Sequence, residues 1–107
     1  LPWWDKPAQP CLASRIPFGE EISSKRLEQI ALAEEWIINQ GFSKVRVRSQ
    51  GLSARIELPA NEINNFLKII ERNQLIEYFL SLGFHSISLD LEGLISGKLT
   101  RDIKKTT

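Results

Sequence analysis

Two stretches with helical spacing of apolar residues end at the same dipeptide, Gly-Phe, and each is followed by a strand pattern. The dipeptides are Gly41-Phe42 and Gly83-Phe84. A glycine just past a helix readily adopts the left-handed conformation that closes the last turn. The sequence therefore predicts two helices, each followed directly by a strand, and this pattern excludes all-α and all-β folds.

The helix starts are less uniform than the helix ends. Ser23 or Ser24 is placed to cap the first helix, because a serine side chain accepts a hydrogen bond from the backbone of the first turn. Asn61 is the corresponding candidate for the second helical stretch, two residues after Pro59, which ends a strand. We expect a break in this second stretch near Asn73.

A hairpin is predicted between the two helical stretches, since residues 44–48 and 53–58 alternate with period two. Residues 49–51 form the connection, and pairing Arg48 with Ser53 keeps one face apolar. The apolar face then consists of Val45, Val47, Ala54 and Ile56.

With a last strand over residues 86–91, the element order is α-β-β-α-β. We expect an α+β two-layer sandwich in which both helices cover one face of a three-stranded sheet of order 2-1-3, with the second and third strands parallel. Residues 1–19 hold four of the five prolines and are interpreted as a proline-rich linker or active-site loop that carries Cys11. Residues 20–107 form the small α/β domain.

Composition excludes several kinds of site. The 107 residues carry a net charge of +1, so an anion site must be built locally. One Cys and one His exclude a disulfide framework and a closed zinc site. No apolar run approaches the ~20 residues of a membrane span. The sequence contains no glycine-rich phosphate loop, and the absence of an initiating Met suggests a fragment or a processed chain.

Cys11 has two interpretations that composition leaves about equally open. A lone cysteine is often a small buried apolar residue. Cys11, however, stands in irregular chain close to the cationic Arg15, which favours the thiolate, the nucleophilic form of a thiol.

An arginine cluster on the polar face of the hairpin is the second candidate site. Arg46 and Arg48 alternate on one strand, and Arg55 lies across the ladder, facing Arg46 in the predicted register. Like charges opposite one another on a sheet are unfavourable unless solvent or an anion compensates them. A solvated outer face is the commoner outcome of such a pattern, and phosphate binding by guanidinium groups is the alternative.

Glu34 places a carboxylate inside the apolar stripe of the first helix. A charge there is costly unless it is compensated. It could pair with an arginine, bind a metal together with Glu57, or lie in an assembly interface.

Several sequence blocks resemble the LarE-type ATP-dependent sacrificial sulfur transferases of the PP-loop superfamily. The N-terminal block is the most specific, and the others recur through the hairpin and the last strand. The matching segments are Trp4-Asp5-Lys6-Pro7-Ala8, Cys11-Leu12-Ala13-Ser14-Arg15-Ile16-Pro17-Phe18-Gly19, Val45-Arg46-Val47-Arg48, Ala54-Arg55-Ile56-Glu57, Gly83-Phe84, Leu89-Asp90-Leu91-Glu92-Gly93 and Ser96-Gly97. Phe18 departs from the family pattern, where Tyr is common.

The resemblance implies a function that composition cannot show. In this family an N-terminal domain uses ATP and Mg²⁺ to adenylate a carboxylate of a pyridinium dicarboxylate mononucleotide, on the route to the nickel-pincer nucleotide. A cysteine of the C-terminal domain then gives its sulfur to the substrate and becomes dehydroalanine. Cys11 matches the sulfur donor, and this chain matches the C-terminal domain.

The same resemblance implies the other site residues and the setting of the protein. It assigns substrate phosphate to Ser14, Arg15, Arg46 and Arg48, and a possible divalent metal to Glu34 and Glu57. It also implies a cytoplasmic homo-oligomer, and it makes membrane or nucleic-acid partners unexpected. The isolated chain is expected to be inactive without the ATP-binding domain.

Two non-catalytic alternatives remain open from the residues alone. The basic hairpin face could bind RNA or another anion, although no aromatic side chains are interleaved on it for base stacking. The chain could also be a stand-alone oligomerisation module that associates through the stripe around Glu34.

Overall fold

The structure, a computed structural model, describes residues 12–94. Cys11 and the rest of the N-terminal segment therefore lie outside the described residues, as does the tail from residue 95. The predicted domain boundary at residues 19 and 20 stays a prediction. Residues 12–16 of the predicted linker are nevertheless part of the packed fold, as described below.

Both predicted helix ends at Gly-Phe are confirmed. Helix α1 spans Ser24–Asn39, and the Ser23 side chain caps it by accepting a hydrogen bond from the Arg26 amide at 3.2 Å. Gly41 has a φ of 106°. Helix α3 spans Arg72–Leu82 and ends at Gly83, which has a φ of 112°. Only glycine adopts this region without steric cost, so the two glycines stop the helices.

The second helical stretch starts and breaks differently from the prediction. A short 3-10 turn, η3, over Ala60–Glu62 leads into helix α2 over Ile63–Ile69, and no side chain caps α2, so Asn61 is not its cap. The break comes at Ile70, which is extended. The Glu71 carboxylate then accepts the Asn73 amide at 3.0 Å and caps α3, so the new helix begins before the expected position.

The hairpin forms from strand β1, Arg46–Gln50, and strand β2, Ser53–Glu57, but its register differs from the expected one. Arg48 pairs with Arg55, a shift of two positions, because the turn contains only residues 51–52. Gly51 makes this tight turn possible with its φ of 56°. An even shift leaves every side chain on its predicted face, so the apolar and polar faces are as expected.

The predicted strand order of 2-1-3 is wrong. Strand β3, Ser86–Leu89, pairs in parallel with β2, so the order is β1-β2-β3. The expected parallel relation between the second and third strands is correct. β3 does not join β1 because the free edge of β1 is already occupied: the Val47 amide donates to the Glu34 carboxylate at 2.9 Å.

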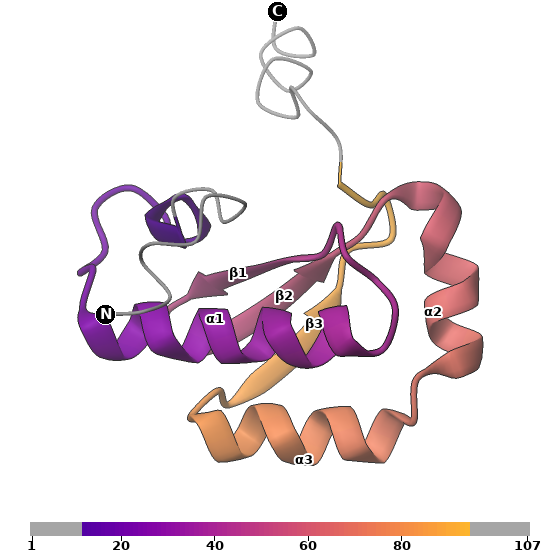
Figure 1. Ribbon diagram of the computed structural model, residues 1–107. Coiled ribbons are helices and arrows are strands. Elements are labelled where there is room, and N and C mark those ends of the chain that lie inside the picture. The colour runs from indigo at the N-terminus through magenta and orange to yellow at the C-terminus, as the bar shows by residue number, and fades with distance from the viewer. Residues whose placement is uncertain (1–11, 95–107) are drawn as a thin grey trace, which may run out of the picture.

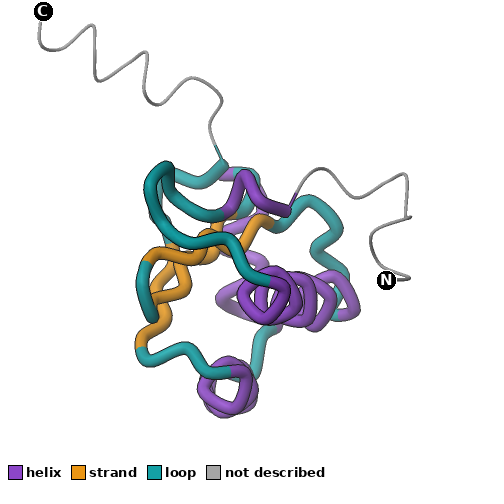
Figure 2. The backbone as a smooth tube through the Cα atoms, turned by 90° about the vertical axis from the view of Figure 1, so that its left-hand side faces the viewer, coloured by secondary structure: helices purple, strands orange, loops and turns teal. Residues whose placement is uncertain are grey.

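The layers follow the predicted two-layer α+β sandwich. Figure 1 and the turned view of Figure 2 show α1 and α3 on the same face of the sheet, with α2 beyond one end of the strands. The other face of the sheet carries the charged side chains of the hairpin. Within residues 12–94, no helix is long and apolar enough to cross a membrane.

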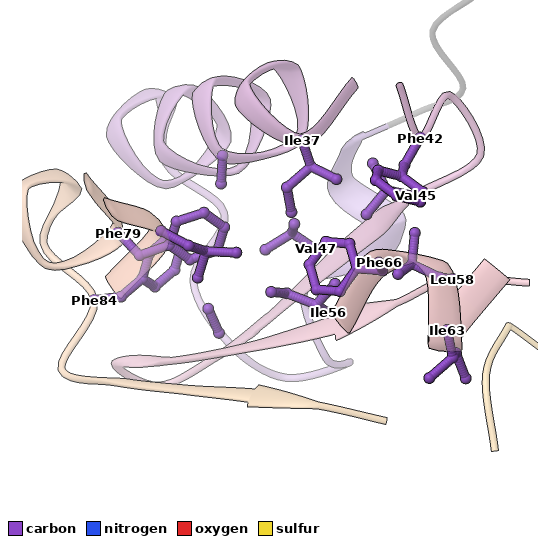
Figure 3. Packing of buried hydrophobic residues seen from close by; sticks show 13 residues of the cluster. Ile37, Phe42, Val45, Val47, Ile56, Leu58, Ile63, Phe66, Phe79 and Phe84 are labelled. Atoms are coloured by element: carbon purple, nitrogen blue, oxygen red, sulfur yellow. The ribbon is translucent and has the colours of Figure 1, made fainter. Parts of the chain in front are cut away.

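The main core lies between α1, α3 and the sheet. Figure 3 shows Ile37 of α1 above Val47 and Ile56, with Phe79 and Phe84 closing one end. The Phe79 and Phe84 rings lie 5.8 Å apart, and the Phe79 side chain is fully buried. This core fixes the position of β1 beneath α1, and β1 carries the arginines of the candidate site.

Candidate functional site

The site begins with a 3-10 turn, η2, over Leu12–Arg15, which directly follows Cys11 in the sequence. Leu12 and Ile16 are buried in a second, smaller cluster with Leu27 and Ile30 of α1. Burial of these side chains attaches the turn to the side of the domain, next to the edge of β1.

Arg15 and Glu34 form a buried ion pair between this turn and α1. The Arg15 Nε and Nη2 atoms donate to the two Glu34 carboxylate oxygens at 2.8 and 3.2 Å. Both side chains are almost fully buried, and the same carboxylate accepts the Val47 amide. Glu34 thus pairs with an arginine, one of its three predicted roles, and joins the turn, α1 and β1 at one point.

A second hydrogen bond joins the turn to the arginine-bearing strand. The Arg48 Nη1 atom donates to the Ser14 carbonyl at 3.2 Å. The Ser14 hydroxyl in turn accepts from Arg15 Nη1 at 3.0 Å. Ser14, Arg15 and Arg48, three residues predicted to bind phosphate, are therefore brought together by the fold.

Glu57 compensates the like charges of two arginines that face each other on the sheet. Arg48 and Arg55 face each other in the ladder, and Glu57 accepts a hydrogen bond from each, at 3.1 Å from Arg48 Nε and 3.1 Å from Arg55 Nη2. The Glu57 carboxylate is buried beneath them. Its charge compensates the repulsion that two opposed arginines would otherwise create.

Arg46 differs from the other arginines of the site. It is half-buried, and within residues 12–94 its guanidinium donates only to the Val45 carbonyl, at 3.0 Å, with no carboxylate bonded to it. Burial lowers its pKa, and repulsion from Arg15 and Arg48 lowers the pKa further, against the attraction of Glu34. Arginine stays protonated nonetheless, so Arg46 is a cation held near two other cations. Such a position favours binding of an anion.

The two carboxylates predicted to bind a metal are both engaged by guanidinium groups. Glu34 is bonded to Arg15, and Glu57 to Arg48 and Arg55. Residues 12–94 contain no group of three or more His, Cys, Asp or Glu side chains arranged for a metal ion. As they stand, these carboxylates fit arginine partners rather than a divalent cation, so we assign no step to a metal here.

Asp90 is a site residue that the sequence reasoning missed. Its carboxylate lies 3.9 Å from Arg55 Nε, just after β3. The signal was available in the period-two pattern, because Asp90 continues the face of Ser86 and Ser88. Periodicity alone does not identify Asp90, because only the observed strand order places β3 beside Arg55.

Comparison with known proteins gives three relatives. The chain is 49% identical over 98% of its length to an uncharacterized protein of Synechocystis, slr1717, and covers 39% of that protein. It is 37% identical over 95% of its length to pyridinium-3,5-bisthiocarboxylic acid mononucleotide synthase of Lactiplantibacillus plantarum, and covers 36% of that enzyme. This chain is related in sequence to that synthase.

A third relative, the uncharacterized protein MJ0830 of Methanocaldococcus jannaschii, is 33% identical over 80% of the chain, which covers 33% of that protein. No family model matches the chain. The chain thus spans a little over a third of the length of the first two relatives.

Proposed function

We propose that this chain is the sulfur-donor and phosphate-binding part of an ATP-dependent sacrificial sulfur transferase. Its substrate is an adenylated pyridinium dicarboxylate mononucleotide. The Cys11 thiolate attacks the activated carboxyl carbon and AMP leaves, which gives a thioester. A base then removes the α-proton of Cys11, the Cβ–Sγ bond breaks, and the substrate departs as a thiocarboxylate while Cys11 becomes dehydroalanine.

The observation that carries the proposal is the hydrogen bond from Arg48 to the Ser14 carbonyl. It holds the turn that directly follows Cys11 against the strand that bears Arg46 and Arg48. A phosphate on these arginines would therefore lie near the turn that directly follows Cys11 in the sequence. The sequence relationship to the synthase supports the choice of a pyridinium mononucleotide as the phosphate compound.

Arg46 is the main phosphate ligand in this proposal, because it has no carboxylate partner within the described part of the chain. Arg48 and Ser14 lie beside the same proposed phosphate position. Arg15 is instead hydrogen-bonded to Glu34 and acts by holding the turn. ATP and Mg²⁺ belong to a part of the enzyme outside this chain, since the sequence has no glycine-rich phosphate loop. The cytoplasmic homo-oligomer implied by the resemblance is part of the same proposal.

The decisive experiment is intact-protein mass spectrometry after turnover of the full-length protein with ATP, Mg²⁺ and the mononucleotide. We expect the protein to lose the mass of one H₂S, with the change mapped to Cys11. Cys11→Ser is the control and should show no mass change. A thiolated product formed while Cys11 keeps its sulfur would exclude the sacrificial mechanism.

Anion binding without catalysis is the second candidate, and it is favoured equally by the Arg46 guanidinium, which has no carboxylate partner within residues 12–94. In that case the protein binds inorganic phosphate or RNA with a steep salt dependence, but its mass stays constant in the turnover experiment. The two candidates therefore give opposite mass results.

A further inference from the structure

The face of the sheet turned away from α1 and α3 is positively charged. Strand alternation places Arg46 and Arg48 of β1, and Arg55 and Glu57 of β2, on this face, whereas both helices lie on the other (Figure 1). Asp90 follows β3 directly, with its carboxylate 3.9 Å from Arg55 Nε. Within residues 12–94, the strands thus present three guanidinium groups against two carboxylates, and an excess of positive charge favours an anionic ligand.

Arg55 uses only part of its guanidinium group within this cluster. Its Nε and Nη2 atoms donate to the same Glu57 oxygen, at 3.3 and 3.1 Å. The Nη1 atom donates no hydrogen bond to any residue between 12 and 94. The Arg55 side chain is also 48% exposed. Because a guanidinium group carries five N–H donors, Arg55 can hold Glu57 and still bind a carboxylate of a ligand.

The strand register sets the distance between Arg55 and the proposed phosphate ligand, Arg46. Arg46 pairs with Glu57, two positions from Arg55, so the two arginines are diagonal neighbours. Diagonal neighbours on one face of a sheet are about 7–8 Å apart. Arg48 is adjacent to both, and it donates to the Ser14 carbonyl of η2. A ligand with one anionic group on Arg46 and another on Arg55 therefore lies beside the turn that Arg48 holds.

We propose that Arg55 binds a free carboxylate on the pyridinium ring of the substrate, while Arg46 binds the phosphate at its other end. This inference rests on the proposed function and concerns which substrates the site accepts. The mononucleotide carries two ring carboxylates, and only one of them is adenylated in a given turnover, so the other stays anionic during thiolation. Arg55 therefore distinguishes a dicarboxylate ring from a ring without carboxylates.

A purely structural role as counter-charge of Glu57 accounts less well for Arg55. Arg48 Nε already donates to the Glu57 carboxylate at 3.1 Å, so the buried charge has a partner without Arg55. The neighbours of Arg55 toward β3 are also small. Ser88 is its partner in the ladder, and Ser53 and Ser86 bond to each other beside it at 2.7 Å. These short side chains leave the guanidinium group open to a ligand.

The test is calorimetric titration of the full-length protein, without ATP, with two mononucleotides that differ on the ring. The pyridinium dicarboxylate mononucleotide carries both carboxylates, whereas nicotinamide mononucleotide shares the phosphoribosyl pyridinium but has no carboxylate. Arg55→Gln should weaken binding of the dicarboxylate by about tenfold or more and leave the affinity for nicotinamide mononucleotide unchanged. Arg46→Gln should weaken binding of both, because both carry the phosphate.

Two further variants separate ligand contact from charge and folding. Arg55→Lys keeps a cation beside Glu57 but lacks the guanidinium fork, so it should show a smaller loss for the dicarboxylate alone. Arg72→Gln removes an exposed arginine of α3 and should change neither affinity.

The effect of Arg55→Gln on the two ligands decides the inference. An undiminished affinity for the dicarboxylate, or an equal loss for both mononucleotides, would overturn it. If Arg46→Gln still weakens binding of both ligands in that case, the proposed phosphate site stands and only the role of Arg55 fails. If Arg46→Gln has no effect either, the phosphate site of the proposed function fails as well. Sulfur transfer is read separately, from the mass of Cys11.

Discussion

The Arg15 Nε atom lies 2.8 Å from the Glu34 carboxylate, and both side chains are almost completely withdrawn from solvent. Their pairing fastens the turn after Cys11 to the first helix. Because Glu34 also accepts the Val47 amide, the pair sets the distance between that turn and the strand that carries Arg46 and Arg48. The ion pair is therefore a positioning element of the candidate site as well as part of the fold.

Replacing one member of the Arg15–Glu34 ion pair should lower the free energy of unfolding far more than replacing both members. Glu34→Ala leaves the Arg15 guanidinium buried without its counter-charge, and we expect the free energy of unfolding to fall by about 3–5 kcal/mol. Glu34→Leu combined with Arg15→Met should cost less than Glu34→Ala alone. Urea unfolding monitored by circular dichroism measures both. Equal losses in the single and double variants would mean that the pair contributes no net charge compensation.

Arg46→Ala should weaken binding of inorganic phosphate by about tenfold or more, because a charge-assisted hydrogen bond is lost from a half-buried site. An NMR titration with phosphate at fixed ionic strength gives the dissociation constant. Arg72→Ala removes an exposed arginine from α3 and serves as the control with unchanged affinity. Equal effects of the two substitutions would indicate binding through net charge alone.

Alanine substitutions at Gly41 and Gly83, which end α1 and α3, should lower the free energy of unfolding by unequal amounts. Both positions have a strongly positive φ, so each substitution costs about 1–2 kcal/mol of backbone strain. At Gly83 the added methyl group would also meet the Gln29 side-chain amide, which donates to the Leu82 carbonyl at 2.6 Å, whereas at Gly41 it meets open space. We therefore expect Gly83→Ala to lower the free energy of unfolding more than Gly41→Ala. Introducing Gln29→Ala into both variants should reduce the difference between their free energies of unfolding. An unchanged difference would show that contact with Gln29 is not its cause.

Glu20 should contribute an acid-sensitive part of the stability. The Gly51 amide donates to its carboxylate at 3.0 Å, and this hydrogen bond lowers the pKa of Glu20 against an opposing effect of burial, with further lowering by Arg26. The folded state thus binds this proton less readily than the unfolded state. The contribution is complete above the ordinary pKa of a glutamate and disappears as the pH falls through the lowered value.

The measurement compares the wild-type protein with Glu20→Gln across the pH range from neutral to acid. The difference in their free energies of unfolding should be largest near neutral pH and should shrink in acid. A difference that stays constant over this range would show that the Gly51 hydrogen bond does not depend on the charge of Glu20.

The helix ends were predictable from the sequence because their causes are local. Ser23, Gly41 and Gly83 act on the turn to which they belong, and each does so in the structure. The two faces of the hairpin were predictable for the same reason, since alternation depends only on the strand itself. The register was wrong by two positions because Gly51 allows a shorter turn than the one expected.

The strand order and the partners in the site depend on contacts between distant residues, which periodicity does not encode. The sequence showed that Glu34 needed compensation, but not that Arg15 and the Val47 amide supply it. The hydrogen bond from the Val47 amide to Glu34 occupies the edge of β1. The same contact between distant residues therefore explains why the sequence predicted neither the partner of Glu34 nor the strand order. The assignment of Cys11 as sulfur donor stays a prediction, since Cys11 lies outside the described residues.

The bond between Glu34 and the Val47 amide also limits how this sheet can grow. If both edge strands of a sheet had free amides, copies of the protein could add one after another and form an open ribbon. Here a carboxylate from α1 occupies the Val47 amide at the β1 edge, so this amide is not available to an added strand. The same glutamate that orders the turn behind Cys11 thus also interrupts the ladder that β1 would otherwise offer to the edge strand of another molecule.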